Sequence, residues 1–294
     1  MAFKKLIYIF LVFSFLFTQQ VFSQSNSDSV TSGPEKGSLL IVGGGRLGQE
    51  IWDKFIELAG GKSATFVVIP TAIGDSAIPA GMATVKQLIN MGLTNVHLLH
   101  TIKPIEANQE DFVNPLLKAS GVWFSGGRQW RLADSYLDTR TQKELENLLN
   151  RGGVIGGTSA GATIMGSYMV RGDTKNNTIM MGDHTVGMNF LKNATIDQHV
   201  MRRNRQFDLI PVIEKFSQLL GIGIDERTAI IVKQDRFEVI GPSYVGIYDA
   251  KQWQVQKIKD GKIAQPFFYL SSGQQYDLKN RKLIAGTQQN AVEE

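Results

Sequence analysis

The sequence lacks cysteine altogether, in a chain of 294 residues. Disulfides, a thiolate nucleophile and cysteine-based zinc sites are therefore excluded. Histidine is scarce as well, with four residues, His97, His100, His184 and His199. Any acid–base chemistry that needs an imidazole must use one of these four side chains.

Charge of one sign does not gather along the chain. The formal net charge is +4, and the basic residues are scattered apart from one cluster at Arg202, Arg203 and Arg205. A nucleic-acid-binding protein usually carries a stripe or patch of lysine and arginine. We therefore expect no nucleic-acid partner.

The N-terminal hydrophobic run is short. Leu6–Phe17 has about a dozen apolar residues, whereas a membrane-spanning helix needs about twenty. The run follows Lys4-Lys5 and precedes Val21-Phe22-Ser23, which is the pattern of a secretory signal peptide. We predict a signal at residues 1–23, cleaved after Ser23, and a protein secreted to the periplasm or the cell exterior with no stable membrane anchor. An uncleaved N-terminal anchor is the alternative. Loss of the two lysines would leave a net charge of +2.

The rest of the chain divides into a leader and one domain. Residues 24–37 are small and polar, which is typical of a flexible segment, and residues 38–294 show no linker or internal repeat. Short apolar runs predict buried strands at Leu39–Val42, Thr65–Ile69, Val96–Leu99, Gly121–Phe124 and Val154–Ile155. Amphipathic stretches between them have helical spacing, at Ile78–Met91, Asn108–Ala119 and Gln129–Asn150. This alternation predicts an α/β fold with a mostly parallel sheet covered by helices on both faces.

The pattern changes after Glu226. β-rich segments at Thr228–Val232, Arg236–Ile240, Tyr244–Tyr248 and Phe267–Leu270 are separated by turn signals at Gly241-Pro242 and Asp260-Gly261. They predict a β-rich, antiparallel extension or sheet edge at the end of the same domain.

One motif carries the chemistry of a nucleophile. Gly157-Thr158-Ser159-Ala160-Gly161 matches the pattern G-x-S-x-G, in which a serine stands at a sharp turn between a strand and a helix. Val154-Ile155 supplies the strand, and the small and apolar residues Ala160–Val170 predict the helix. The Ala160 N–H and the helix dipole can then stabilise an oxyanion. A glycine-rich turn with an incidental serine is the alternative.

A serine nucleophile needs a base. His97 and His100 fall on a predicted strand and at its end, which favours structural roles, and His184 lies in a polar loop. His199 ends the segment Asp197-Gln198-His199 after a short β-like run and precedes two arginines. Taken alone, His199 is as compatible with a structural role as with a catalytic one.

A second glycine-rich segment fits the dinucleotide fingerprint G-x-G-x-x-G. It is Gly43-Gly44-Gly45-Arg46-Leu47-Gly48, directly after a predicted strand. A nucleotide site would require an acidic residue near the end of the next strand, and that strand ends in Val68-Ile69-Pro70-Thr71. A turn packed beside the active site is the favoured interpretation. We expect no metal and no organic cofactor.

Four motifs together resemble those of cyanophycinases and the wider peptidase family S51, which also contains aspartyl dipeptidase. They are Phe124-Ser125-Gly126-Gly127-Arg128-Gln129, Gly157–Ala162, Asp197-Gln198-His199 with Arg203 and Arg205, and Gly223-Ile224-Asp225-Glu226. The resemblance extends from about Leu39 to the C-terminal strands. It implies a single α/β domain of three-layer, flavodoxin-like or class I glutamine amidotransferase-like type. The nucleophile would lie at the C-terminal end of a central strand.

The resemblance also implies roles for particular residues. Ser159 would be the nucleophile, His199 the general base and Glu226 the carboxylate that orients the imidazole, although Glu226 alone would be taken for a solvated turn residue. These three groups are chemically sufficient. Gly127 would join Ala160 in the oxyanion hole. Five further residues would surround the substrate: Gln129, Asp197, Gln198, Arg203 and Arg205. Arginines suit this role because a guanidinium grips a carboxylate through two hydrogen bonds.

Two positions depart from the pattern of the family. Asp208 stands where cyanophycinases usually carry a third arginine, and Val200 stands where an aromatic residue is common. A carboxylate cannot bind a carboxylate. We therefore expect Asp208 either to point away from the pocket or to bind a cationic group.

The implied reaction is hydrolysis of cyanophycin, a polyaspartate with arginine on its side chains, from the chain end to give β-aspartyl-arginine. One alternative is an aspartyl or isoaspartyl dipeptidase of the same clan. The other is a non-catalytic secreted binding protein on the same scaffold. The expected partner is a peptide or cyanophycin-like substrate. The oligomeric state stays open, a homodimer included.

Overall fold

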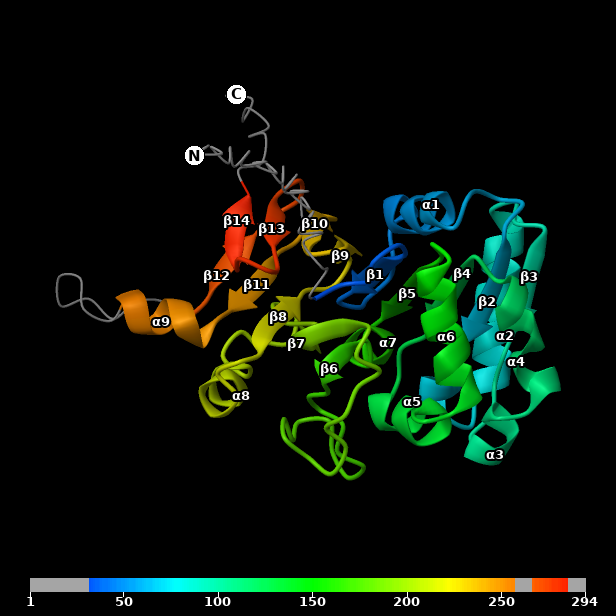
Figure 1. Ribbon diagram of the computed structural model, residues 1–294, viewed down its shortest axis with the longest axis horizontal. Coiled ribbons are helices and arrows are strands. Elements are labelled where there is room, and N and C mark those ends of the chain that lie inside the picture. The colour runs from blue at the N-terminus through cyan, green and yellow to red at the C-terminus, as the bar shows by residue number, and fades with distance from the viewer. Residues whose placement is uncertain (1–31, 257–265, 285–294) are drawn as a thin grey trace, which may run out of the picture.

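The structure is a computed structural model that describes residues 32–256 and 266–284. Within these residues it contains two β-sheets with flanking helices (Figure 1). The larger sheet has nine strands in the order β14-β13-β10-β9-β1-β5-β4-β2-β3. Their bounds are β1 Ser38–Val42, β2 Thr65–Ile69, β3 Asn95–Leu98, β4 Gly121–Phe124, β5 Val154–Thr158, β9 Ala229–Lys233, β10 Arg236–Ile240, β13 Gln275–Asp277 and β14 Lys282–Ile284.

The larger sheet has a parallel half and an antiparallel half. Strands β1, β5, β4, β2 and β3 pair in parallel. Strands β9, β10, β13 and β14 continue the sheet with antiparallel pairs. The strands β1, β2 and β4 are nearly continuous apolar runs because both of their faces are covered. The expected α/β fold is confirmed, with the predicted parallel strands in one half of this sheet and antiparallel strands of the C-terminal extension in the other.

A second sheet of five strands lies beside the first. Its order is β12-β11-β8-β7-β6, with β6 Gly166–Tyr168, β7 Leu191–Gln198, β8 Leu220–Ile224, β11 Val245–Tyr248 and β12 Phe268–Leu270. The β-rich C-terminal extension is therefore confirmed but divided: β9 and β10 join the larger sheet, and β11 and β12 join the second. The break falls at Gly241, whose φ of +102° lets the chain turn between the sheets.

Helices cover both faces of the larger sheet, which gives the expected three layers. The longer ones are α1 Gln49–Leu58, α2 Ala77–Asn90, α4 Glu110–Lys118, α5 Gln129–Tyr136 and α6 Arg140–Asn150. The shorter ones are α3 Pro104–Ala107, α7 Ala160–Thr163, α8 Ile210–Lys215 and α9 Ala250–Gln256. On one face, Trp52 and Phe55 of α1 pack against Trp123 of β4. On the other face, α4, α6 and the second sheet share a core with β1, β4 and β5.

Two expected helices differ from the structure. The helix expected at Ala160–Val170 is wrong in length, because α7 ends at Thr163 and β6 begins at Gly166. Pairing of β6 with β7 overrides the helical pattern there. The stretch expected as one helix, Gln129–Asn150, is two helices. They are separated at Asp138, whose φ of +57° is incompatible with a continuous helix.

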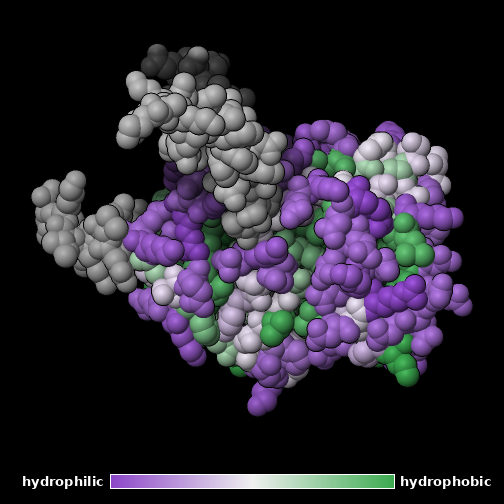
Figure 2. All heavy atoms as spheres, viewed as in Figure 1, coloured by the Kyte–Doolittle hydropathy of each residue, from purple (hydrophilic) through white to green (hydrophobic). Residues whose placement is uncertain are grey.

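The outer surface is mostly polar. Figure 2 shows one face, where hydrophilic residues dominate and hydrophobic residues form small separate groups. Neither residues 32–256 nor residues 266–284 contain a helix with the length and apolar character needed to cross a bilayer. The predicted signal peptide lies outside the described residues.

The described part of the predicted leader, residues 32–37, contacts the domain. The Ser32 N–H donates to the Asp235 carboxylate at 2.7 Å, and the Ser32 carbonyl accepts from the Lys192 N–H at 2.8 Å. A Cβ on Gly33 would collide with the Gln234 carbonyl. This segment therefore packs beside the β9–β10 turn.

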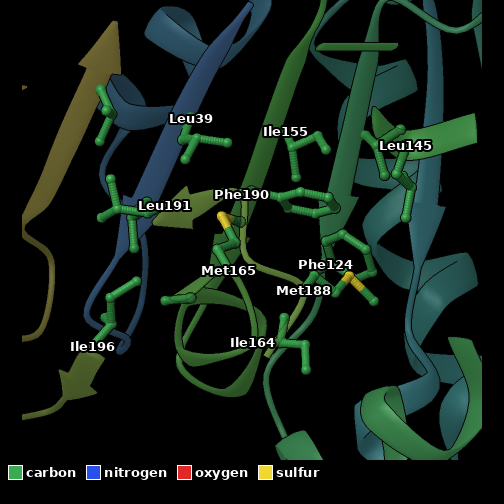
Figure 3. Close-up of a cluster of buried hydrophobic side chains, with 14 of the residues drawn as sticks. Leu39, Phe124, Leu145, Ile155, Ile164, Met165, Met188, Phe190, Leu191 and Ile196 are labelled. Atoms are coloured by element: carbon green, nitrogen blue, oxygen red, sulfur yellow. The ribbon is translucent and has the colours of Figure 1, made fainter. Parts of the chain in front are cut away.

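A hydrophobic cluster lies between the two sheets (Figure 3). Leu39, Phe124 and Ile155 project from β1, β4 and β5 toward Met165 and Phe190. Each of these side chains is 5% exposed or less, and burial of such a side chain contributes about 1.5–3 kcal/mol. Met165 follows α7 and Phe190 precedes β7, so this core anchors both segments against the larger sheet.

Candidate active site

Ser159 occupies a strained turn between β5 and α7. Its backbone has φ +54° and ψ −112°, a conformation that residues with a side chain rarely adopt. The flanking glycines allow close backbone packing. A Cβ on Gly157 would lie 2.5 Å from the Gly161 carbonyl oxygen, and one on Gly161 would lie 2.7 Å from the Phe124 Cβ. The turn therefore has the form of a nucleophile elbow.

His199 brings its imidazole to this serine. It directly follows β7, with φ +56°, and it is 5% exposed. Its Nε2 lies 2.9 Å from Ser159 Oγ, and its Nδ1 lies 2.6 Å from Glu226 Oε1. Glu226 lies in the loop between β8 and β9. The structure thus brings the three predicted residues into one hydrogen-bonded chain.

Three successive carbonyls at the end of β1 hold the three segments in place. The Val42 carbonyl accepts from the Ser159 N–H at 3.0 Å, and the Gly43 carbonyl accepts from the His199 N–H at 2.9 Å. The Gly44 carbonyl accepts from the N–H of Arg227, the neighbour of Glu226, at 2.9 Å. The turn after β1 therefore aligns serine, histidine and glutamate.

The glycines of this turn make room for the catalytic candidates. A Cβ on Gly44 (φ +123°) would lie 2.6 Å from His199 Nδ1, and one on Gly45 (φ +74°) would lie 2.7 Å from Glu226 Oε2. The expectation of a turn packed beside the site is confirmed. It accounts for the G-x-G-x-x-G pattern without a nucleotide.

The surroundings of His199 favour its neutral form. Burial lowers the pKa of the imidazole, the Glu226 hydrogen bond raises it, and the charges of Arg203 and Arg205 lower it; the net shift is below the usual 6.5. With Nδ1–H donated to Glu226, the neutral ring presents Nε2 as a proton acceptor to Ser159.

The predicted oxyanion residues flank Ser159. Ala160 is the first residue of α7. Gly127 follows β4 with φ +138°, and a Cβ there would lie 2.8 Å from the Ile73 nitrogen. A Cβ on the adjacent Gly126 would lie 3.2 Å from the Ser159 Cβ, so this loop passes close to the serine.

The predicted substrate residues Gln129, Gln198, Arg203 and Arg205 gather on the side of His199. The buried Gln129 amide donates to the Val170 carbonyl at 2.8 Å. Arg205 Nη1 donates to the carbonyl and side-chain oxygens of Gln198, both at 3.2 Å. Arg203 is exposed, and its N–H donates to the His199 carbonyl at 3.0 Å.

Asp197 is held by a residue that sequence reasoning missed. Arg171 Nε donates to Asp197 Oδ1 at 2.7 Å and Arg171 Nη2 donates to Asp197 Oδ2 at 2.9 Å. Nη2 also donates to Asp208 Oδ2 at 2.6 Å. Asp208 therefore binds a cationic group, the second of its two expected arrangements. Arg171 carries no local signal in the sequence, because it belongs to no motif and directly follows a segment with the pattern of a helix.

A groove opens next to the serine turn. Its volume is about 730 Å³, and it lies between α1, α2 and the ends of β1, β4 and β5. Its lining includes Arg46, Trp52, Trp123, Gly126 and Thr158. Thr158 Oγ1 is buried without a hydrogen-bond partner among the described residues. The serine turn thus adjoins both the segment that carries Arg203 and Arg205 and a groove whose lining includes two tryptophans.

A hydroxyl, an imidazole and a carboxylate in one hydrogen-bonded chain at the end of a parallel strand define a site of the serine hydrolase class. The family model of peptidase family S51 matches residues 39–240. The chain therefore belongs to peptidase family S51, a family of serine-type peptidases.

Curated relatives and solved structures agree with this assignment. The cyanophycinase of Geminocystis herdmanii is 29% identical over 269 residues, covering 85% of this chain and 97% of the relative. The cyanophycinase of Trichormus variabilis is 33% identical over 225 residues, covering 73% and 74%. The fold is shared with a peptidase from an acI-B1 actinobacterium, at TM-score 0.63, 24% identity and coverage of 84% and 98%. A putative peptidase E from Listeria monocytogenes has TM-score 0.52, 20% identity and coverage of 71% and 100%.

Proposed function

We propose that this protein is a secreted serine exopeptidase that hydrolyses cyanophycin to β-aspartyl-arginine dipeptides, with Ser159 as nucleophile, His199 as general base and Glu226 as the orienting carboxylate. The observation that carries the proposal is the chain of contacts at 2.9 and 2.6 Å from Ser159 through His199 to Glu226. The similarity to cyanophycinases supports the substrate. The N-terminal pattern before Gln24 supports secretion.

The mechanism follows from the positions of these groups. His199 Nε2 takes the proton of the Ser159 hydroxyl as Oγ attacks the scissile carbonyl, and Glu226 stabilises the resulting imidazolium. The N–H groups of Ala160 and Gly127 receive the oxyanion. The imidazolium then protonates the leaving amine, and an acyl-enzyme forms. Water, deprotonated by His199, hydrolyses this ester and restores the serine.

Substrate groups on the two sides of the scissile bond would meet different surfaces. Arg203 and Arg205 lie near His199 and suit carboxylates. The groove whose lining includes Trp52 and Trp123 reaches Thr158, next to Ser159, and offers room for the rest of a peptide. Both surfaces adjoin the serine, as cleavage of a branched polymer requires.

A second candidate function is an aspartyl or isoaspartyl dipeptidase. The contact between Asp208 and Arg171 favours it, because Asp208 stands in place of an arginine and is already paired within the chain. A non-catalytic binding protein is disfavoured by the alignment of serine, histidine and glutamate.

The test is an assay of the mature protein on insoluble cyanophycin beside a panel of aspartyl and isoaspartyl dipeptides. Release of β-aspartyl-arginine is expected, and Ser159→Ala is the control for contaminating peptidases. Hydrolysis of dipeptides alone would replace the first candidate by the second. Absence of hydrolysis on every substrate would refute both.

A further inference from the structure

Arg171 is a cation built into the wall of the candidate site. Its side chain is 2% exposed and its backbone has φ +56°. The guanidinium meets both oxygens of Asp197, which is fully buried, and one oxygen of Asp208. Its Nη1 donates to the Asn177 carbonyl at 3.2 Å. The side chain is therefore fixed by contacts from three separate segments.

This ion cluster adjoins the catalytic candidates. Asp197 lies two residues before His199, and the Gln198 N–H donates to Asp197 Oδ1 at 2.9 Å. Val170, the neighbour of Arg171, accepts the Gln129 amide. Burial lowers the pKa of Arg205, the charge of Arg171 lowers it further, and the carboxylates of Asp197 and Asp208 raise it. The cluster, the buried Arg205 and the exposed Arg203 thus belong to one electrostatic unit.

The charges in this unit are unequally available to a ligand. Asp197 and Asp208 are two carboxylates that would attract a cationic group of a substrate, but the fork of Arg171 already occupies them. Arg203 and Arg205 have no carboxylate partner of this kind among the described residues. Both are close enough to lower the pKa of His199. The charge presented beside His199 is therefore positive.

We propose that Arg171 determines specificity: it occupies the carboxylates of Asp197 and Asp208, so that the site beside His199 accepts an aspartyl carboxylate and does not recognise a substrate guanidinium. The inference rests on the proposed function and names its substrate class. The enzyme recognises the aspartyl part of a branched aspartyl peptide, and the arginine on the side chain contributes little to recognition.

The first experiment uses the wild-type protein and two matched β-aspartyl peptides that differ only in arginine or citrulline. Citrulline has the same shape and no charge. The expected kcat/KM for the arginine peptide is less than about fivefold above that for the citrulline peptide, because a recognised guanidinium would give about tenfold or more. A larger preference for arginine would overturn the proposal.

The second experiment uses Arg171→Ala, which removes the guanidinium that binds Asp197 and Asp208 and leaves both carboxylates free to bind a ligand. The ratio of kcat/KM between the arginine and citrulline peptides is expected to rise about tenfold or more. Methylguanidinium should compete with the arginine peptide and raise the Tm of the alanine variant, with neither effect on wild type. Arg171→Lys keeps the charge and is expected to keep the wild-type ratio. An unchanged ratio in a folded alanine variant would count against the proposal.

Removal of Arg171 leaves Asp197 buried without its partner, so the alanine variant is purified with methylguanidinium present. The wild-type comparison does not depend on that variant. A binding measurement with Ser159→Ala separates this proposal from the proposed function. If wild type hydrolyses neither peptide while Ser159→Ala binds both equally, the function fails and the specificity stands. If Ser159→Ala binds neither peptide, or binds only the arginine peptide, the proposal about Arg171 and specificity is wrong.

Discussion

The neighbouring strands β1 and β5 both end in glycine-rich turns, and the glycines serve different purposes in the two. In the turn after β5, Gly157 and Gly161 leave room for backbone, which lets the chain reverse sharply at Ser159. In the turn after β1, Gly44 and Gly45 leave room for the side chains of His199 and Glu226. One turn presents a reactive group and the other positions its partners.

The comparison shows why a glycine pattern alone does not identify a ligand. The turn after β1 satisfies a nucleotide fingerprint, yet its carbonyl groups and the open Cα positions of Gly44 and Gly45 contact the chain itself. Its carbonyls hold the Ser159, His199 and Arg227 backbones. A pattern of glycines indicates that some group packs closely against the backbone, and the structure shows which group it is.

The largest effect is expected at the turn that presents the nucleophile. Ser159→Ala removes the attacking oxygen and should lower kcat by about 10⁶-fold. Circular dichroism and Tm should remain near wild type, because the side chain is small. Comparable turnover by the alanine variant, in protein free of other peptidases, would rule out the serine mechanism.

A smaller loss of kcat is expected when Glu226, the proposed orienting carboxylate, is changed. Glu226→Gln keeps the shape of the side chain but can favour the wrong tautomer of His199, and kcat should fall by about 10⁴-fold. Stopped-flow or endpoint assays of peptide cleavage would measure the loss. Glu214→Gln is a matched control at a carboxylate on α8. If Glu226→Gln retained wild-type turnover, Glu226 would not orient the imidazole.

The glycines themselves provide the direct test of the comparison. Gly44→Ala should displace the His199 ring and lower kcat by about 10²-fold, with a loss of stability of about 1 kcal/mol from its positive φ. Gly161→Ala meets backbone and should lower the Tm more strongly. Parallel measurements of kcat and Tm decide the point. Equal loss of stability in both variants would remove the distinction between the turns.

The smallest effect concerns the arginine nearest the imidazole in sequence. The Arg203 charge lowers the pKa of His199, and the proposed mechanism needs the neutral ring, which is lost as the pH falls through that pKa. Arg203→Gln should therefore raise the pKa and move the acid limb of kcat/KM to higher pH. At neutral pH the loss should stay below about tenfold. Arg203→Lys, which keeps the charge, and Arg202→Gln should leave the acid limb in place. An acid limb that stays in place in Arg203→Gln as well would exclude this electrostatic effect.

Much of the larger sheet could be predicted from the sequence, because its parallel strands are compact apolar runs. β2, β4 and β10 have the predicted bounds. The second sheet was predicted only in part: β11 and β12 fall on expected β-rich segments, whereas β6 and β8 do not. β6 follows a segment of small residues, and β8 reads Leu-Gly-Ile-Gly-Ile, so neither alternates in the way that marks a half-buried strand. Long-range pairing with β7 determines both.

The site was predictable to the extent that its residues lie in local motifs. Ser159 stands in a G-x-S-x-G pattern, which by itself predicts the sharp turn. The role of His199 was ambiguous from its local sequence, and the role of Glu226 was inferred only from the resemblance to the family. Arg171 could not be found, because an ion pair with Asp197 and Asp208 is a relation between segments that no local pattern records. The family resemblance drew attention to Asp197 and Asp208 but not to Arg171, which binds both carboxylates.

The alignment of three segments on the carbonyls of Val42, Gly43 and Gly44 has a consequence for the order of events in folding. β1 pairs with β5 and with β9, both far along the chain, and such distant contacts form slowly. A chain that already has its helices but has not inserted β1 between these strands holds serine, histidine and glutamate apart. Recovery of peptidase activity on refolding should therefore lag behind recovery of helical signal, and an incompletely folded molecule cannot cut its neighbours.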